Sequence, residues 1–157
     1  MNTTMIDRYE AGATLPVKAI DGLTEAEWDA TPGPGDWSVR QVILHLMDSD
    51  LIASDRMKRV IAESNPALHA YDASVFARSL FYDRLDPVAA CEMFRLNRRL
   101  TAAILRALPA EAFLRTGVHS ERGVESLARI VEIYTDHLDH HVNFIREKRA
   151  RLGKPMA

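Results

Sequence analysis

Cysteine is nearly missing from this sequence, since Cys91 is the single thiol among 157 residues. A disulfide within the chain is therefore impossible, and a reducing cytoplasm is the expected setting. Long hydrophobic runs are also missing. No stretch of about 18 apolar residues occurs, so we expect no membrane span. The segment from Met1 to Arg8 has no apolar core of signal-peptide length, and no signal peptide is expected.

A large excess of one charge sign is missing as well. The chain has 20 Lys and Arg against 22 Asp and Glu, which gives a formal net charge of -2. No global basic field favours nucleic acid, so nucleic acid is not an expected partner. The basic residues between Arg146 and Lys154 lie at the C-terminal end of the last predicted helix, where cations complement the negative end of the helix dipole.

The remaining composition is typical of one globular domain. Hydrophobic residues make up 47% of the chain and charged residues 27%, which argues against disorder. A length of 157 residues suits one hydrophobic core. We therefore expect a single domain over residues 1–157.

Alternating apolar-polar stretches are scarce, so the sequence predicts an all-α fold. The strongest break is Thr31-Pro32-Gly33-Pro34-Gly35-Asp36. Between the breaks lie runs rich in Ala, Leu, Arg, Glu and Met, which favour helices. The four main helices of a bundle are predicted over residues 3–21, 38–63, 87–107 and 124–151. Short helices are predicted over residues 24–29, 73–80 and 109–114.

Residues at the ends of these segments support the boundaries. Ser38 is suited to cap the second helix, because its hydroxyl can accept from unpaired backbone N–H groups. Pro87 is well placed in the first turn of the third helix. The fourth helix is predicted to end near Gly153 and Pro155.

The last predicted helix has the clearest periodicity. Its buried stripe, at three-to-four spacing, consists of Leu127, Ile130, Tyr134, Leu138 and Ile145. His137 and His141 fall inside this stripe, and His140 lies at its edge. On the second helix, His45 lies at the border of the apolar face, a position that suits a partly wet pocket.

Histidines at positions i and i+4 project from one side of a helix and can share a metal ion at about 2.0–2.1 Å each. A third nitrogen from another element would complete the set. The spacing alone is not specific, because the chain has six histidines. The alternative is that His137 and His141 are core histidines, hydrogen-bonded to side chains or water.

Several other kinds of site do not fit. The general base that a metalloprotease has next to its first histidine is Glu, and here the residue is Leu138. The last helix has no Glu-x-x-His pair of a di-metal site, and the chain has no Cys-x-x-Cys-His haem motif. The segment Gly33-Pro34-Gly35 has the wrong residues for a phosphate-binding loop.

Three motifs point to a known family. Trp37 to Leu46 reads Trp-Ser-Val-Arg-Gln-Val-Ile-Leu-His-Leu, and the loop before the last helix reads His119-Ser120-Glu121-Arg122-Gly123. His137-Leu138-Asp139-His140-His141 is a His-x-x-His-His pattern. In type, order and separation these motifs resemble the DinB-like superfamily, which includes YfiT-type proteins named as metal-dependent hydrolases. The resemblance spans most of the chain.

The resemblance implies an up-down-down-up four-helix bundle that is often a homodimer. It implies a divalent metal ion, nickel or zinc, on His45, His137 and His141, with a cleft beside it. Some relatives are transferases or isomerases that use low-molecular-weight thiols such as bacillithiol or mycothiol. Some of those relatives have Glu in place of one ligand, whereas this sequence keeps three histidines.

Two kinds of chemistry are compatible with such a site. An ion held by three neutral imidazoles can lower the pKa of bound water to about 7, or hold a thiol as thiolate. We therefore expect a metal-dependent enzyme acting on a small molecule, either a thiol S-transferase or a hydrolase. The alternatives are a non-catalytic, stress-related bundle that binds metal or a small molecule, and a structural bundle whose histidines trap metal.

No catalytic residue is assigned from the sequence. Asp48, His140 and Tyr134 are candidate bases only because they lie near the proposed ligands along their helices. His119 falls in the loop that resembles the family's loop, and no role is given to it.

Overall fold

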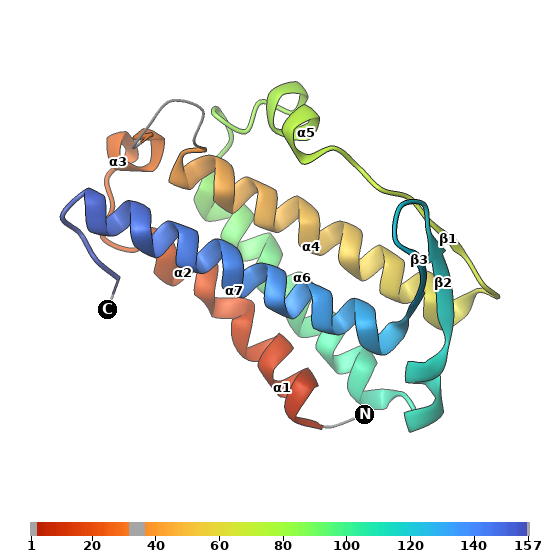
Figure 1. The fold of residues 1–157 in the computed structure, drawn as a ribbon. Coiled ribbons are helices and arrows are strands. Elements are labelled where there is room, and N and C mark those ends of the chain that lie inside the picture. The colour runs from red at the N-terminus through yellow and green to blue at the C-terminus, as the bar shows by residue number, and fades with distance from the viewer. Residues whose placement is uncertain (1–2, 32–36, 157) are drawn as a thin grey trace.

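Four long helical segments make up most of the computed structural model, which describes residues 3–31 and 37–156 (Figure 1). Among these residues, no helix is both long and apolar enough to span a membrane. The elements in order are α1 (Thr3–Ala11), the 3-10 helix η1 (Gly12–Thr14), α2 (Leu15–Ile20), α3 (Glu25–Asp29), α4 (Val39–Ala62), β1 (Ala67–Leu68), α5 (Ala73–Ser79), α6 (Pro87–Ala107), the 3-10 helix η2 (Ala110–Leu114), β2 (Thr116–His119), β3 (Gly123–Ser126) and α7 (Leu127–Arg151).

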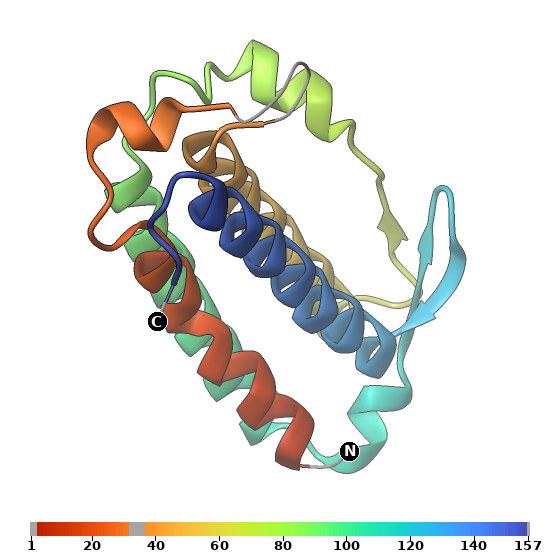
Figure 2. The same ribbon diagram turned by 60° about the vertical axis from the view of Figure 1, so that its left-hand side comes forward.

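The segments run up-down-down-up, as expected from the resemblance. Figure 1 shows α1 and α2 running in one direction, α4 and α6 in the opposite direction, and α7 back in the first. Figure 2 shows α1, α2 and α6 on one side of the bundle and α4 and α7 on the other. Because α4 and α6 run in the same direction, the chain must return from the end of α4 to the start of α6. A long connection that contains β1 and α5 makes this return.

The predicted helix ends are confirmed where capping residues define them. Ser38 Oγ accepts from the Gln41 N–H at 3.2 Å, and Gln41 Oε1 accepts from the Ser38 N–H at 2.9 Å. This reciprocal capping box satisfies two backbone groups at the start of α4. Pro87 begins α6, and Gly153 follows α7 with a φ of 71°. Most of the Pro-Gly break, residues 32–36, lies outside the described residues.

The helix predicted over residues 3–21 is present as a helical segment from Thr3 to Ile20, but the 3-10 helix η1 interrupts it. Pro16 has no N–H to bond the carbonyl of Gly12, so the α-helical pattern is interrupted there. Gly12 also lies against the core, since an added Cβ would come within 2.5 Å of Leu138 Cδ2 and 2.8 Å of Arg98 Nη1. The first segment of the bundle is therefore α1, η1 and α2 in succession.

The prediction that the last helix begins at residue 124 was wrong. Residues 123–126 form β3, which pairs with β2 in an antiparallel hairpin, while β1 pairs with β2 in parallel. Gly123 leaves the turn with a φ of 77°, a conformation that favours glycine. The helix begins one residue after Ser126, whose Oγ accepts from the Arg129 N–H at 3.2 Å.

An ion pair is buried inside the bundle. Arg98 of α6 and Asp50 of α4 are each 2% exposed, and Arg98 Nε donates to Asp50 Oδ1 at 2.7 Å. The other two nitrogens of the guanidinium donate to the backbone carbonyls of Tyr9, at 3.1 Å, and Tyr134, at 2.7 Å. One side chain thus links α1, α4, α6 and α7.

Candidate metal centre

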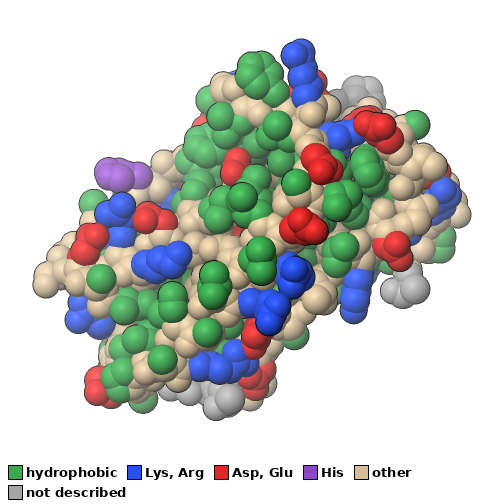
Figure 3. Space-filling view, turned by 180° about the vertical axis from the view of Figure 1, so that it is seen from behind, with side chains coloured by type: hydrophobic (Ala, Val, Ile, Leu, Met, Phe, Trp, Pro, Cys, Tyr) green, Lys and Arg blue, Asp and Glu red, His purple; other side chains and the backbone are tan. Residues whose placement is uncertain are grey.

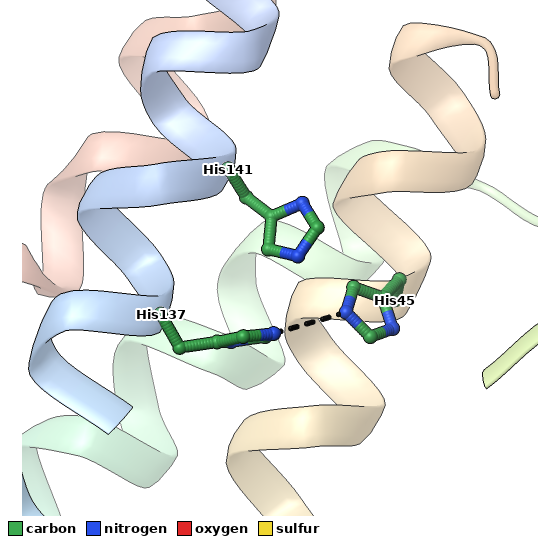
Figure 4. A group of neighbouring side chains, drawn as sticks. All are labelled: His45, His137 and His141. Atoms are coloured by element: carbon green, nitrogen blue, oxygen red, sulfur yellow. Dashed lines mark hydrogen bonds between the residues drawn. The ribbon is translucent and has the colours of Figure 1, made fainter. Parts of the chain in front are cut away.

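Three histidine rings converge between α4 and α7 (Figure 4). His45 extends from α4, and His137 and His141 extend from α7, one helical turn apart. The ring centroids lie 5.1 Å apart for His45 and His137, 4.7 Å for His45 and His141, and 4.5 Å for His137 and His141. One ring nitrogen from each residue lies within 4.8 Å of the other two.

This geometry fits a shared divalent ion. His45 Nε2 and His137 Nε2 are 3.2 Å apart. Two nitrogens that each bind a tetrahedral metal at about 2.05 Å are separated by about 3.3 Å. Without a cation, two of three converging imidazole nitrogens must both be donors or both be acceptors, so they cannot all pair with one another, whereas an ion accepts all three lone pairs. The donor set of three imidazoles suits zinc or nickel.

Burial keeps the three rings in the form that binds metal. It lowers the pKa of His45 to about 4 and that of His141 to about 4. The pKa of His137 falls to about 3, first through burial and then through its two histidine neighbours. All three imidazoles are therefore neutral at pH 7, and no proton has to leave before a metal ion binds.

The metal-free protein should lose stability as the pH falls from about 6.5 toward 4. Unfolded histidines have a pKa of about 6.5, so in this window the unfolded state binds protons that the folded state does not. Each such proton contributes a slope of roughly 1.4 kcal/mol per pH unit. Urea unfolding of chelator-treated protein at pH 7.5, 6.5 and 5.5 measures the effect.

A double variant provides the control for this measurement. In His45→Gln with His141→Gln, two of the three titrating rings are replaced by amides that do not titrate, and the slope should shrink. An unfolding free energy of the unsubstituted chain that stays constant between pH 7.5 and 5.5 would contradict the prediction.

A cavity of about 210 Å³ adjoins His137, one of the three histidines. Its wall includes Ser49 and Arg56 of α4, Tyr134 and His137 of α7, and His119 at the end of β2. Residues of the connection around positions 70–73 and of the hairpin turn form the rest of its wall. The cavity lies where α4 and α7 pack together, and Figure 2 shows the connection and the hairpin on the outer side of this helix pair.

Comparison with known proteins identifies the family. Residues 8–145 match the model of the DinB superfamily. The chain belongs to the DinB superfamily. The resemblance stated from the three sequence motifs is thereby confirmed, and it extends over most of the bundle.

Relatives within the DinB superfamily carry names that refer to metal. The chain is 33% identical over 140 residues to the "Putative metal-dependent hydrolase OB0782" of Oceanobacillus iheyensis, which covers 89% of this chain and 81% of the relative. It is 28% identical over 137 residues to the "Putative metal-dependent hydrolase YfiT" of Bacillus subtilis, covering 87% of this chain and 77% of the relative.

Solved structures agree with the fold. The structure of YfiT from Bacillus subtilis, described as "a probable metal-dependent hydrolase with an unusual four-helix bundle topology", superposes with a TM-score of 0.87 at 26% identity. It covers 98% of this chain and 90% of that one. A DinB-like protein of the same organism, YjoA, has a TM-score of 0.64 at 12% identity, covers 96% and 93%, and supports the fold alone.

The structure separates the candidate bases predicted for this DinB-superfamily chain. Tyr134 lies in the cavity wall, with its ring centroid 6.0 Å from that of His137. Asp48 accepts a hydrogen bond from the Tyr82 hydroxyl and does not line the cavity. His140 is exposed, although its ring contacts that of His141 at 5.2 Å.

Arg56 is a cavity residue that the sequence analysis missed. The spacing in the sequence could have indicated this residue. Ser49 and Arg56 follow His45 at intervals of four and seven residues, so all three lie along one face of α4. The role of His119 was left open. It is buried at the end of β2, and strand pairing across segments distant in sequence brings it to the cavity.

Proposed function

We propose that this chain is a metal-dependent enzyme that acts on a small molecule, with one divalent ion, zinc or nickel, on His45, His137 and His141. The main observation in favour of an enzyme is the cavity beside His137. A structural zinc site closes its coordination shell with protein ligands, whereas a catalytic site keeps a position open to substrate. Here only three candidate ligands gather among the described residues, and His137 forms part of the wall of a cavity.

Hydrolysis is the reaction that we favour. A bound divalent ion would supply a water with a pKa near about 7 and would polarise an ester or amide carbonyl. The names of the relatives agree with this reaction. Thiol S-transfer needs the same ligands, and it is the second candidate because the site equally suits a thiolate.

Tyr134 is placed to donate a proton or a hydrogen bond to the reacting molecule. Its hydroxyl accepts a hydrogen bond from Arg56 Nη1, so the phenolic proton remains available for another acceptor. Burial raises the pKa of Tyr134, which keeps the group protonated at neutral pH. A hydrogen-bond donor fixed beside the ligands would stabilise negative charge that develops on a carbonyl oxygen.

An activity screen tests this function. We expect the metal-loaded chain to hydrolyse members of a panel of small esters and amides, to lose this activity with a chelator, and to regain it with one equivalent of zinc or nickel. Tyr134→Phe should lower kcat by about 100-fold while the metal stays bound. Tyr82→Phe is the matched control, because it removes another buried hydroxyl, which bonds Asp48 outside the cavity.

Each other outcome favours a different function. Metal-dependent consumption of a low-molecular-weight thiol with an electrophile, without hydrolysis, would favour the S-transferase. Stoichiometric metal with turnover in neither screen would favour the non-catalytic binding protein. Hydrolysis that survives complete removal of metal would contradict the proposal.

The homodimer implied by the family resemblance remains a prediction, which sedimentation velocity of the purified chain checks. One face of α6 exposes the apolar side chains of Val88, Met93, Leu96, Leu100 and Ile104. Figure 3, seen from behind the view of Figure 1, shows hydrophobic side chains over much of this face. Such a face is compatible with association.

A further inference from the structure

Two buried nitrogens with no hydrogen-bond partner belong to residues that line the same cavity as His137. They are Arg56 Nε and His119 Nε2, on side chains that are only 4% and 2% exposed. A buried donor left unpaired costs about 1–3 kcal/mol, and more when the group is charged. Two such donors at one cavity therefore point to an acceptor that occupies it.

The hydrogen bonds of His119 determine which ring nitrogen carries the proton. Nδ1 accepts from the backbone N–H groups of Glu121, at 3.2 Å, and Arg122, at 3.3 Å. Burial, together with Arg122 and Arg56, lowers the pKa of His119 and keeps the ring neutral. A neutral imidazole that accepts at Nδ1 carries its proton at Nε2. His119 Nε2 is therefore a donor on the opposite edge of the ring.

Among the described residues, no carboxylate forms an ion pair with the Arg56 guanidinium. Its two terminal nitrogens donate to neutral oxygens, the Tyr134 hydroxyl and the backbone carbonyl of His69. Arg122, also in the cavity wall, is paired with Glu125 through bonds of 2.6 and 3.1 Å. Among the described residues that line the cavity, Glu121 is the single acidic one. It is exposed, so water screens its charge.

We propose that Arg56 and His119 form an oxyanion subsite, which holds a carboxylate or phosphate group of the substrate in the cavity that His137 also lines. An oxyanion would accept from both unpaired donors and neutralise the buried guanidinium. The statement that this oxyanion belongs to the substrate rests on the proposed function, whereas the anion site follows from the two unpaired donors alone. The enzyme would then act on small anionic molecules.

Titration of the full chain with small probes tests the subsite. Nitrogen-15 NMR follows the side-chain signals of His119 and Arg56 as sodium acetate, inorganic phosphate or neutral acetamide is added, with and without bound zinc. We expect saturable binding of acetate or phosphate in both forms, at least about tenfold tighter than binding of acetamide. The tighter of the two anions identifies the group as carboxylate or phosphate.

Paired substitutions at His119 isolate the donor. His119→Asn keeps an acceptor at the position of Nδ1 but removes the Nε2 donor, and it should weaken anion binding about tenfold. His119→Gln can place an amide donor near the position of Nε2 and should bind more tightly than the Asn variant. Arg56→Lys removes the Nε donor, and Arg59→Lys, at an exposed arginine of the same helix, is its control.

The outcomes separate the subsite from the metal site. Acetamide binding as tightly as the anions, or unchanged anion binding in both His119→Asn and Arg56→Lys, overturns the subsite. One equivalent of metal together with no saturable anion binding overturns the subsite alone. Anion binding that persists in a chain that takes up no metal supports the subsite and contradicts only the proposed metal-dependent function.

Discussion

Stoichiometric binding of a divalent metal ion is expected to disappear when His137 is replaced by alanine. The Nε2 atoms of His137 and His45 are 3.2 Å apart, so removal of one ring leaves two ligands, a set too small to define the site. Changes to residues that only support metal ligands already weaken affinity by about 10–100-fold, and loss of a ligand should cost at least about 100-fold. His45→Ala and His141→Ala should behave in the same way.

Elemental analysis of untagged protein, followed by calorimetric titration with zinc and nickel, measures this effect. His69→Ala is the matched control, because His69 is exposed and contributes only its backbone carbonyl to Arg56. We expect near one equivalent of metal in the unsubstituted chain and in His69→Ala, and none in the three ligand variants. A full equivalent of metal in His45→Ala would return the three histidines to the core.

Replacing Arg98 by methionine should lower the free energy of unfolding by about 3–5 kcal/mol, because the buried Asp50 carboxylate loses its only cationic contact among the described residues and keeps only the neutral Asn97 donor. Burial raises the pKa of Asp50, and Arg98 opposes that shift while it is present. The backbone carbonyls of Tyr9 and Tyr134 lose their donors in the same step. Since these groups lie in α1, α4 and α7, the whole bundle should unfold at lower urea concentration.

Two comparisons make this test specific. Arg99→Met changes the next residue, which is exposed, and should alter the unfolding free energy by no more than about 0.5 kcal/mol. Combining Asp50→Leu with Arg98→Met removes both charges and should recover part of the loss. An Arg98→Met variant that unfolds at the same urea concentration as the unsubstituted chain would refute the structural role of the ion pair.

The helices were predictable where local signals determine them. The capping box of Ser38 and Gln41 and the proline at the start of α6 act within a few residues, and the structure confirms both. The proximity of His137 and His141 could likewise be predicted from the sequence, because the helical period of 3.6 places positions four apart on one face. The convergence of His45 on that pair was expected only from a resemblance between motifs.

The misjudged segments depend on contacts between distant parts of the chain. Residues 123–126 are extended because they pair with β2, which also pairs with β1 about 50 positions earlier in the sequence. Gly12 is required by the close approach of Leu138 and Arg98 rather than by any turn readable in its neighbours. Periodicity and propensity contain no information on such approaches.

Local hydrogen bonds and helix geometry are enough to specify the helical class, the capped helix ends and the shared face of His137 and His141, so these features could be predicted from the sequence. The contact of the His45 ring with the other two, and the cavity that Arg56 and His119 share with His137, depend on how the helices and the hairpin pack. The chemistry of a buried group depends on which neighbours desolvate it or leave it unpaired, and packing of α4, α7 and the hairpin supplies those neighbours.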